Sequence, residues 1–214
     1  MTPEQEPQRE KRRANAADER GMPSHFNQRV FVVRHGQTEW SLAGKHTGRT
    51  DLPLTEAGKL GATKLHPVLA HLNFEMILTS PLQRAKQTAQ LAGFDEAIIE
   101  PNLVEWDYGD YDGVTTHEIR KRVPGWTVFT HPCPNGETAE QVGRRVDHVI
   151  RKVRDCRGDA ILFAHGHVLR VLCARWLGLP PTNGKSFILG TATLNILAYE
   201  HETPVIKVWN EHIH

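Results

Sequence analysis

Two short runs of the chain are apolar at every position, and they constrain the fold more than any other feature. Residues 30–33 read VFVV, and residues 160–164 read AILFA. A strand with one face in water alternates apolar and polar residues, so these two runs must be buried on both faces. Such strands occur in mainly parallel sheets with helices on both sides. The runs therefore predict an α/β fold, a three-layer α/β/α sandwich around a mainly parallel sheet.

The rest of the chain alternates helix and strand signals around these two runs. From hydrophobic periodicity we predict strands over 29–33, 76–79, 98–100 and 160–164, and helices over 55–72, 80–92, 138–155 and roughly 168–177. The last two runs, 192–199 and 204–209, alternate apolar and polar residues, which predicts an antiparallel pair at one edge of the sheet.

Two of the predicted helices begin with recognisable capping signals. Ser80 stands as the N-cap of the helix over 80–92, with Pro81 in the first helical position and Gln83 completing a capping box. Thr138 and Gln141 form a second box before the helix over 138–155.

Titratable side chains follow both apolar runs at the point where each strand ends. Arg34 and His35 come directly after the first run, and His165 follows the second. In open parallel sheets, ligands bind beyond the carboxyl ends of the strands, where the strand order reverses. We therefore expect these three side chains to meet in one cleft, although the two histidines lie 130 positions apart.

The residue types at these strand ends suit the chemistry of a phosphoryl group. Arginine presents a planar fork of donors to phosphate oxygens and keeps its charge. A histidine among fixed positive charges is driven to its neutral form, and neutral imidazole is a nucleophile. Arg84 lies near the start of the helix over 80–92, beside the positive end of the helix dipole. Glu105, in an aromatic loop punctuated by glycine, is the candidate proton donor for the leaving oxygen.

A set of short motifs, ordered along the chain, resembles one known family. The motifs are RHGQTEW at 34–40, KHTG at 45–48, DLPLTEAG at 51–58, TSPLQRAKQTA at 79–89, EWDYGDYDG at 105–113, GET at 136–138 and HGHVLR at 165–170. Together they resemble the histidine phosphatase superfamily, in its branch with the phosphoglycerate mutases. The spelling EWDYGDYDG, followed by GET, is most similar to the acid phosphatase and sugar-bisphosphatase members.

The resemblance implies a role for each of five residues. His35 matches the histidine that becomes phosphorylated, and Glu105 matches the proton donor. The residues that hold the transferring phosphoryl group are matched by Arg34, Arg84 and His165.

Four further positions are assigned to substrate binding by the same resemblance. Thr38, Ser41 and Gly166 match positions that line the pocket in relatives, and His167 is placed with them. Ser41 stands where mutases usually have asparagine. Thr38 and Ser41 have a second interpretation, as residues that cap backbone groups.

Other departures favour a phosphatase over a mutase. Mutases usually carry Arg-His after the glutamate, where this chain has Trp106 and Asp107, and they carry asparagine at His167. Only about thirty residues separate Glu105 from Glu137, where mutases have a longer insert with two arginines that grip phosphoglycerate. We therefore expect a phosphomonoester hydrolase that acts on small phosphorylated metabolites. A phosphoglycerate mutase and a non-catalytic module that binds phosphorylated ligands remain open as alternatives.

Four basic residues have no role assigned by the resemblance, and they do not identify the substrate. Lys45, Arg49, Arg120 and Arg122 are candidates to grip a second phosphate or a carboxylate of the substrate, or they are solvated.

Charge and cysteine content restrict the partners and the compartment. Twenty-six basic and 25 acidic side chains give a formal net charge of +1, which favours neither nucleic acid nor a membrane surface as the main partner. The three cysteines are far apart and form no CxxC pair, so we expect reduced thiols and a cytoplasmic protein. No apolar run approaches the ~20 residues of a membrane-spanning helix. A homodimer remains open.

The 13 histidines do not predict a metal site. His165 and His167 have no carboxylate or cysteine at ligand spacing, and the neighbouring arginines would repel a cation. We therefore expect neither a metal ion nor a cofactor.

The start of the chain differs from the rest. It is polar, mixed in charge and without hydrophobic periodicity, and it lacks the apolar stretch of a secretory signal. We predict a disordered extension over residues 1–27, followed by one histidine phosphatase domain over 28–214. Met22 offers an alternative start.

Overall fold

The computed structural model describes residues 24–156 and 158–214. Its centre is a six-stranded sheet in the order β3-β2-β4-β1-β5-β6. The strands are β1 (Val30–Arg34), β2 (Met76–Thr79), β3 (Ile98–Ile99), β4 (Ala160–Ala164), β5 (Thr193–Glu200) and β6 (Thr203–His212). Strands β1 to β4 run parallel, β5 is antiparallel to β1, and β6 is antiparallel to β5. The predicted mainly parallel sheet with an antiparallel edge is confirmed.

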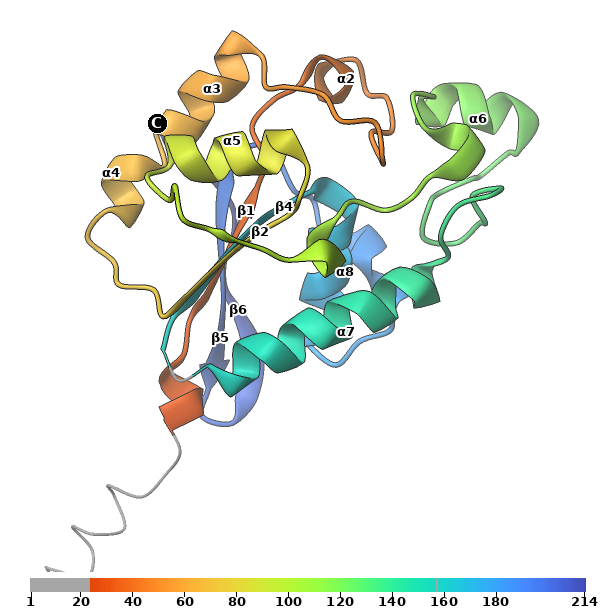
Figure 1. Cartoon of the computed structure of the whole chain (residues 1–214). Helices are drawn as coiled ribbons and strands as arrows, with labels where there is room; N and C mark the ends of the chain where they lie inside the picture. Colours follow the sequence, from red (N-terminus) through yellow and green to blue (C-terminus); the bar gives the residue numbers. More distant parts are fainter. Residues whose placement is uncertain (1–23, 157) are drawn as a thin grey trace, which may run out of the picture.

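Helices cover both faces of the sheet (Figure 1). They are α2 (Glu39–Leu42), α3 (Glu56–Thr63), α4 (His66–Leu69), α5 (Gln83–Leu91), α6 (Thr116–Arg122), α7 (Ala139–Asp155) and α8 (Gly166–Trp176), with short 3₁₀ helices η1 (Ser24–Asn27), η2 (Pro101–Leu103), η3 (Gly109–Tyr111) and η4 (Pro181–Ser186). The predicted three-layer α/β/α sandwich is therefore confirmed. None of the described helices is both long and apolar enough to cross a membrane.

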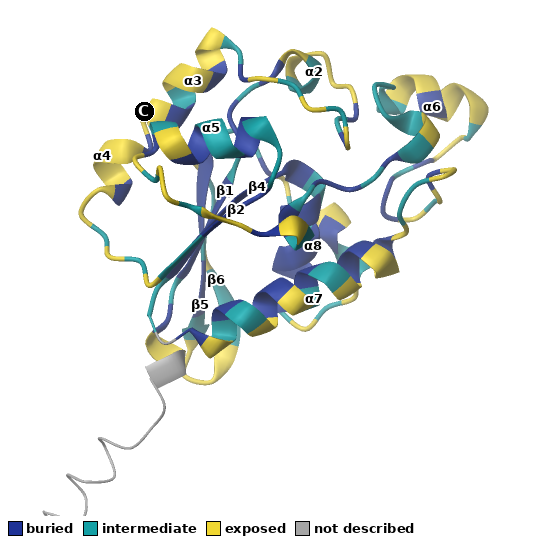
Figure 2. Cartoon of the chain, in the orientation of Figure 1, coloured by how far each residue is buried: buried dark blue, intermediate teal, exposed yellow. Residues whose placement is uncertain are grey.

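Alternate residues of the central strand enter two different cores. Val30 and Val32 pack in the cluster that includes the apolar faces of α7 and α8. Phe31 and Val33 pack in the cluster that includes residues of α4 and α5. All four side chains are buried, which explains why the run has no polar position. Figure 2 shows the same pattern, with buried residues concentrated on the sheet and on the helix faces that cover it.

One predicted helix is divided in two. The periodicity over 55–72 predicts a single helix, but α3 ends at Thr63 and α4 begins at His66. Pro67 lies in the first turn of α4, where a proline is tolerated, and it could not have continued α3 because it has no N–H to donate. Leu60, an apolar residue within the predicted helix, is 62% exposed.

The predicted cap of α5 is wrong. Helix α5 begins at Gln83, and the residue before it, Leu82, makes no side-chain capping bond. The cap comes instead from a distant loop, because Asp51 Oδ1 accepts the N–H of Gln83 at 2.8 Å. Ser80 is buried, and its hydroxyl lies 2.7 Å from Nε2 of His165.

Two other helices begin at or near the residue that the sequence predicts. The box of Thr138 and Gln141 caps α7 as predicted. Helix α8 begins at Gly166, two residues before the predicted start, with His165 as its N-cap.

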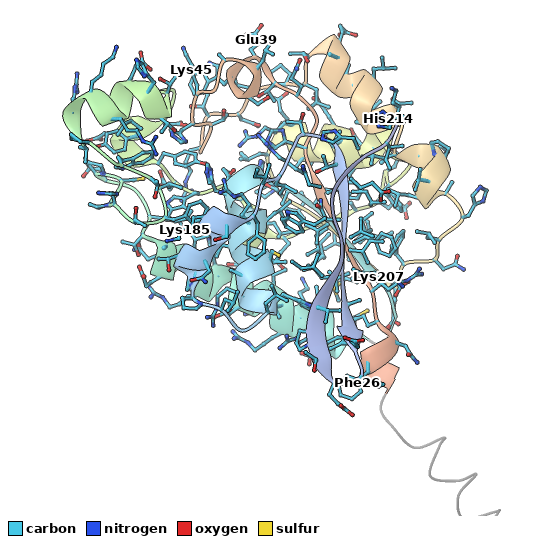
Figure 3. The ribbon with its side chains drawn as sticks, turned by 180° about the vertical axis from the view of Figure 1, so that it is seen from behind. Phe26, Glu39, Lys45, Lys185, Lys207 and His214 are labelled. Carbon is cyan, nitrogen blue, oxygen red and sulfur yellow. The ribbon has the colours of Figure 1, made fainter. Side chains whose placement is uncertain are left out.

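The N-terminal prediction lies mostly outside the described residues. Of the stretch 1–27, only Ser24–Asn27 is described, and it forms η1. The ring of Phe26 lies 5.6 Å from that of Tyr199 on β5. Viewed from behind, Figure 3 shows Phe26 at the opposite end of the molecule from Glu39 and Lys45, with Lys207 of β6 at the sheet edge.

Candidate active site

The carboxyl ends of three neighbouring strands place distant residues side by side. In the parallel register of β1 and β4, Arg34 pairs with Ala164, so the next residues, His35 and His165, leave the sheet at the same level. Their imidazole centroids are 5.1 Å apart. Ser80 leaves β2 beside them, and its N–H donates to Phe163 O at 2.9 Å. The sheet therefore holds both histidines at one edge.

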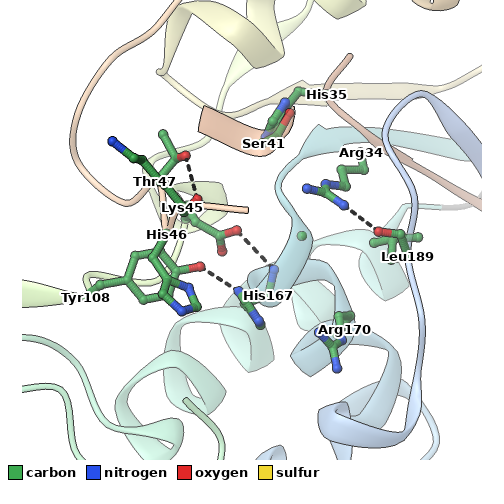
Figure 4. A pocket seen from close by; sticks show the side chains of 12 residues that line it. Arg34, His35, Ser41, Lys45, His46, Thr47, Tyr108, His167, Arg170 and Leu189 are labelled. Atoms are coloured by element: carbon green, nitrogen blue, oxygen red, sulfur yellow. Dashed lines mark hydrogen bonds between the residues drawn. The ribbon is translucent and has the colours of Figure 1, made fainter. Parts of the chain in front are cut away.

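A small cavity opens at this edge, with a volume of about 90 Å³. Six of the residues predicted for the site line it: Arg34, His35, Ser41, Glu105, Gly166 and His167. Lys45, His46, Thr47, Tyr108, Arg170 and Leu189 complete the lining (Figure 4). The volume is far below the ~300–1,000 Å³ of pockets that enclose a whole drug-sized ligand. It suits a phosphoryl group, and the remainder of a larger ligand would extend from the mouth.

His35 is held as a neutral imidazole. Its Nδ1 lies 2.7 Å from the carbonyl oxygen of Gly36, so Nδ1–H donates and Nε2 carries the lone pair. Burial, followed by the charges of Arg84 and Arg34, lowers the pKa of His35 well below its usual value of 6.5. A neutral imidazole on the cavity wall is a competent nucleophile at neutral pH.

Arg34 is a half-buried cation with unused donors. One Nη1–H is donated to the carbonyl oxygen of Leu189, but the buried Nε has no hydrogen-bond partner among the described residues. Gly166 allows this placement, because a Cβ there would lie 3.3 Å from the Nε of Arg34. An unpartnered buried donor costs about 1–3 kcal/mol. A bound oxyanion would remove that cost.

Arg84 lies behind the cavity and not in its lining. It is fully buried, and burial is the main cause that lowers its pKa. Its Nε donates to Nδ1 of His165 at 3.0 Å, and its Nη atoms donate to the carbonyls of Thr47, Gly48 and Thr50 at 2.9–3.1 Å. Arg84 therefore fixes both the second histidine and the loop that forms one rim of the site.

His165 has both ring nitrogens engaged by the protein. Because Nδ1 accepts from Arg84, Nε2 carries the hydrogen and donates to Ser80 Oγ at 2.7 Å. Burial and then the charge of Arg84 lower the pKa of His165 well below 6.5. In this structure His165 stands beside His35 but presents no free nitrogen to the cavity.

Glu105 faces the cavity from a loop and caps α8 from outside the helix. Its Oε1 accepts the N–H groups of Trp106 and Val168 at 2.8 and 2.9 Å, and its Oε2 accepts that of His167 at 3.0 Å. The first-turn amides of a helix have no partner within the helix, so a carboxyl group from another segment can satisfy them. The carboxyl group is thereby held on the same cavity as His35.

Comparison with known proteins agrees with this geometry. The family model of the histidine phosphatase superfamily (branch 1) matches residues 30–212. The chain belongs to this superfamily. The resemblance drawn from the ordered motifs is thereby confirmed.

Two curated relatives and one solved structure illustrate the relationship. The chain is 38% identical over 179 residues to an acid phosphatase of Mycobacterium tuberculosis, covering 82% of this chain and 88% of the relative. It is also 38% identical over 221 residues to the sedoheptulose 1,7-bisphosphatase of Saccharomyces cerevisiae, covering 87% and 80%. The solved structure of an open reading frame product of Mycobacterium tuberculosis superposes with a TM-score of 0.83 at 37% identity, covering 88% of this chain and all of the other.

Thr38 and Ser41 cap each other at the start of α2 in this histidine phosphatase. The N–H of Ser41 donates to Thr38 Oγ1, and the N–H of Thr38 donates to Ser41 Oγ. Thr38 is fully buried and does not line the cavity, whereas Ser41 does. The capping interpretation therefore fits both residues, and only Ser41 also faces the cavity.

Two neutral aromatic side chains beside His167, those of His46 and Tyr108, were not assigned from the sequence. The hydroxyl of Tyr108 lies 2.6 Å from Nδ1 of His167, and the ring of His46 is 4.7 Å from that of Tyr108. Burial lowers the pKa of His167 well below 6.5 and that of His46 to about 4, and it raises that of Tyr108. His46 and Tyr108 lie in the motifs at 45–48 and 105–113, but no local pattern shows that their rings pack together.

Cationic residues at the cavity lack carboxylate partners. Among the described residues, no carboxylate lies within ion-pair distance of Arg34, Arg84, Arg170 or Lys45. Arg170 lies over the ring of Phe129, and its Nε and Nη2 donate to the carbonyls of Gly184 and Lys185. The site is therefore electropositive. Within the described residues, no cluster of three or more His, Cys, Asp or Glu is arranged to hold a metal ion.

The other basic residues considered from the sequence do not line the cavity. Arg49 pairs with Asp107 at 3.0 Å. Arg120 donates to Trp126 O at 2.8 Å, and Arg122 lies in the last turn of α6.

Proposed function

We propose that this histidine phosphatase is a metal-independent phosphomonoester hydrolase that acts on small phosphorylated metabolites through a phosphohistidine. One observation carries the proposal. His35 is kept neutral by burial and by two arginines, and it lies on the same small cavity as Arg34, whose buried Nε has no partner. A neutral nucleophile beside an unpaired guanidinium suits attack on a phosphoryl group.

In the first step, Nε2 of His35 attacks phosphorus in line with the ester oxygen. The new N–P bond forms as the P–O bond to the leaving group breaks, and the protonated carboxyl of Glu105 gives its proton to the departing alkoxide. Arg34 holds the equatorial oxygens, over which the negative charge spreads.

In the second step, water attacks the phosphohistidine. Glu105, now a carboxylate, accepts a proton from the water, the N–P bond breaks, and inorganic phosphate leaves. His35 returns to its neutral form and Glu105 to its protonated form, so the cycle closes without another reactant.

Arg84 and His165 support these steps from behind His35. The charge of Arg84 lowers the pKa of both imidazoles. Nε2–H of His165 can reach a phosphate oxygen only by giving up Ser80, so we infer that a bound phosphoryl group replaces that hydrogen bond.

The test asks whether turnover requires His35 and whether His35 becomes phosphorylated. We expect His35→Ala to remove turnover, and rapid quench of the unmodified enzyme to trap an acid-labile phosphoryl group on His35. His71→Ala, at an exposed position, is the control for histidine removal. Full activity of His35→Ala would overturn the proposal.

The unpaired cations favour a substrate with a second anionic group. Arg170 and Lys45 line the cavity together with Arg34, and one curated relative is named for a sugar bisphosphate. We therefore expect a sugar bisphosphate to be cleaved with a lower KM than the matching monophosphate. Lys45→Met should raise KM for the bisphosphate and leave KM for p-nitrophenyl phosphate unchanged. Equal effects on both substrates would contradict this.

The same panel should include 3-phosphoglycerate with a bisphosphate primer. Interconversion of phosphoglycerates faster than phosphate release would favour the mutase, and binding without turnover would favour the non-catalytic module.

All three cysteines are free and buried, which supports a cytoplasmic location. Size-exclusion chromatography separates the monomer from the homodimer.

A further inference from the structure

The segment that carries Glu105 has neither a strand nor an α-helix of its own. It leaves η2 at Leu103, passes Trp106 and enters η3 at Gly109. The backbone groups of such a segment need partners from elsewhere in the chain. The amides of α8 donate to the carboxyl group of Glu105. The backbone carbonyls of the segment are bound by a residue of a different helix, α7.

One arginine of α7, Arg145, makes these hydrogen bonds to the backbone. Nε and Nη2 of Arg145 bind the two carboxyl oxygens of Glu137 at 2.8 and 3.0 Å. Its Nη1 donates to the carbonyls of Asn102 and Val104, both at 2.7 Å, and its Nη2 also donates to the carbonyl of Glu105 at 3.1 Å. These five bonds match the five N–H groups of a guanidinium. The side chain is only 13% exposed.

Glu137 closes the same network from the other side. Its Oε2 accepts the N–H of Asp107 at 2.9 Å, and its carbonyl accepts Nε1–H of Trp106 at 2.8 Å. Its own N–H donates to the carbonyl of Asp107 at 2.8 Å. Gly136 permits this approach, because a Cβ there would lie 2.3 Å from that carbonyl oxygen. The GET motif thus contributes a close contact, a carboxylate and the cap of α7.

We propose that Arg145 is a positioning residue for the reaction, and that with Glu137 it sets where the Glu105 carboxyl group stands relative to the leaving oxygen. The inference rests on the proposed function, in which Glu105 is the acid. Misplacing a reacting group by about 1 Å can cost ~10²-fold in rate. A lysine at this position would retain the charge, but its donors radiate from one nitrogen and cannot span the carboxylate and three carbonyls.

The experiment compares two substrates that differ in their need for an acid. p-Nitrophenolate leaves without a proton, whereas the alkoxide of glycerol 2-phosphate needs one. We expect Arg145→Lys to slow single-turnover phosphorylation by glycerol 2-phosphate about 10–10²-fold more than phosphorylation by p-nitrophenyl phosphate. Glu105→Gln should show the same preference more strongly. In the double variant the preference should not exceed that of Glu105→Gln.

Arg175→Lys is the matched control. Arg175 also makes a two-pronged pair, with Asp147 at 2.8 and 3.0 Å, and it donates to the carbonyl of Leu179. It contacts none of the segment around Glu105, so its loss should lower stability without changing the ratio of the two rates. Thermal unfolding of each variant separates a folding defect from a rate effect.

Each outcome decides the matter. Equal losses on both substrates in Arg145→Lys, or additive losses in the double variant, overturn the positioning role. Equal losses on both substrates in Glu105→Gln overturn the acid role and this inference together. Phosphate release that still depends on His35 would then leave the hydrolase itself standing.

Discussion

At the scale of single residues, the site works by keeping charges unpaired. Arg84 is buried and Arg34 is half-buried, and neither has a carboxylate within ion-pair distance among the described residues. Burial of the His35 ring lowers its pKa most, and the charges of Arg84 and then Arg34 lower it further. A buried cation is costly unless it is paired. Here the unpaired charges help to keep the imidazole of His35 neutral, and the Nε–H of Arg34 stays free for an anion.

The pH dependence of phosphorylation should reflect this. Because the pKa of His35 lies well below 6.5, the imidazole stays neutral as the pH falls through 6.5. We expect the single-turnover rate with saturating p-nitrophenyl phosphate to persist from about pH 7.5 to about pH 5.5. A loss with its midpoint near 6.5 would show that His35 titrates as a free histidine and would contradict the structure.

Removing Arg84 should harm both catalysis and folding. Arg84→Ala deletes the charge beside His35 and leaves the carbonyls of Thr47, Gly48 and Thr50 without their donor. We expect turnover to fall by about 10²–10³ and unfolding free energy to fall by at least about 2 kcal/mol. Arg84→Lys, which retains the charge, should recover more of the turnover than of the stability. A change confined to KM would show that Arg84 contributes only to uniform substrate binding.

At the scale of elements, the loop after β1 is placed by direct backbone contact with α3. A Cβ on Gly36 would lie 2.4 Å from Gly58 O, and a Cβ on Gly58 would lie 2.1 Å from Gln37 O. Contacts this short leave no room for any side chain. The glycines of the motifs at 34–40 and 51–58 therefore hold the loop that carries His35 in place without lining the cavity.

Two alanine substitutions on α3 should have opposite effects. Gly58→Ala must push the loop that carries His35, so we expect turnover and thermal stability both to fall. Gly61→Ala is the control on the same helix, since its Cβ would meet nothing closer than Ala192 Cβ at 3.4 Å. Gly61→Ala should raise the stability by up to about 1 kcal/mol, because alanine favours the helix. Wild-type turnover in Gly58→Ala would contradict the close packing.

At the scale of the whole molecule, four histidines are held in the neutral form: His35, His46 and His165 are buried, and His167 is half-buried. In the unfolded chain each would titrate near 6.5. The unfolded state therefore binds more protons than the folded state below that pH. Their contribution to stability is fully present above about pH 6.5 and is lost as the pH falls toward the lower folded pKa values.

The fall in stability at low pH should therefore be measurable, and part of it should be assignable to His46. For His46, the shift of the pKa from 6.5 to about 4 corresponds to about 3 kcal/mol of stability lost between these pH values. We expect urea unfolding to show a stability that falls over this window, and His46→Gln to flatten the fall. A curve for His46→Gln parallel to that of the wild type would mean that His46 is not buried neutral.

The sequence by itself determined the layers and the strand ends, and it named six candidate residues that line the cavity. Runs that are apolar at every position leave no solvent face, and motifs such as RHG and HGH lie within a few residues of their strand. The cap of α7 was predictable for the same reason, because Thr138 and Gln141 lie within one helical turn. Local periodicity carries this information, since neighbouring residues determine it.

Only the tertiary structure determined which side chains form hydrogen bonds with one another. Asp51 caps α5, so Ser80 is left to bind His165, and Arg84 takes the other nitrogen of that ring. Arg145 donates to three carbonyls that lie 40, 41 and 43 positions away in the sequence. Hydrogen bonds between segments far apart in the chain depend on how the layers pack, and no local pattern records which donor meets which acceptor.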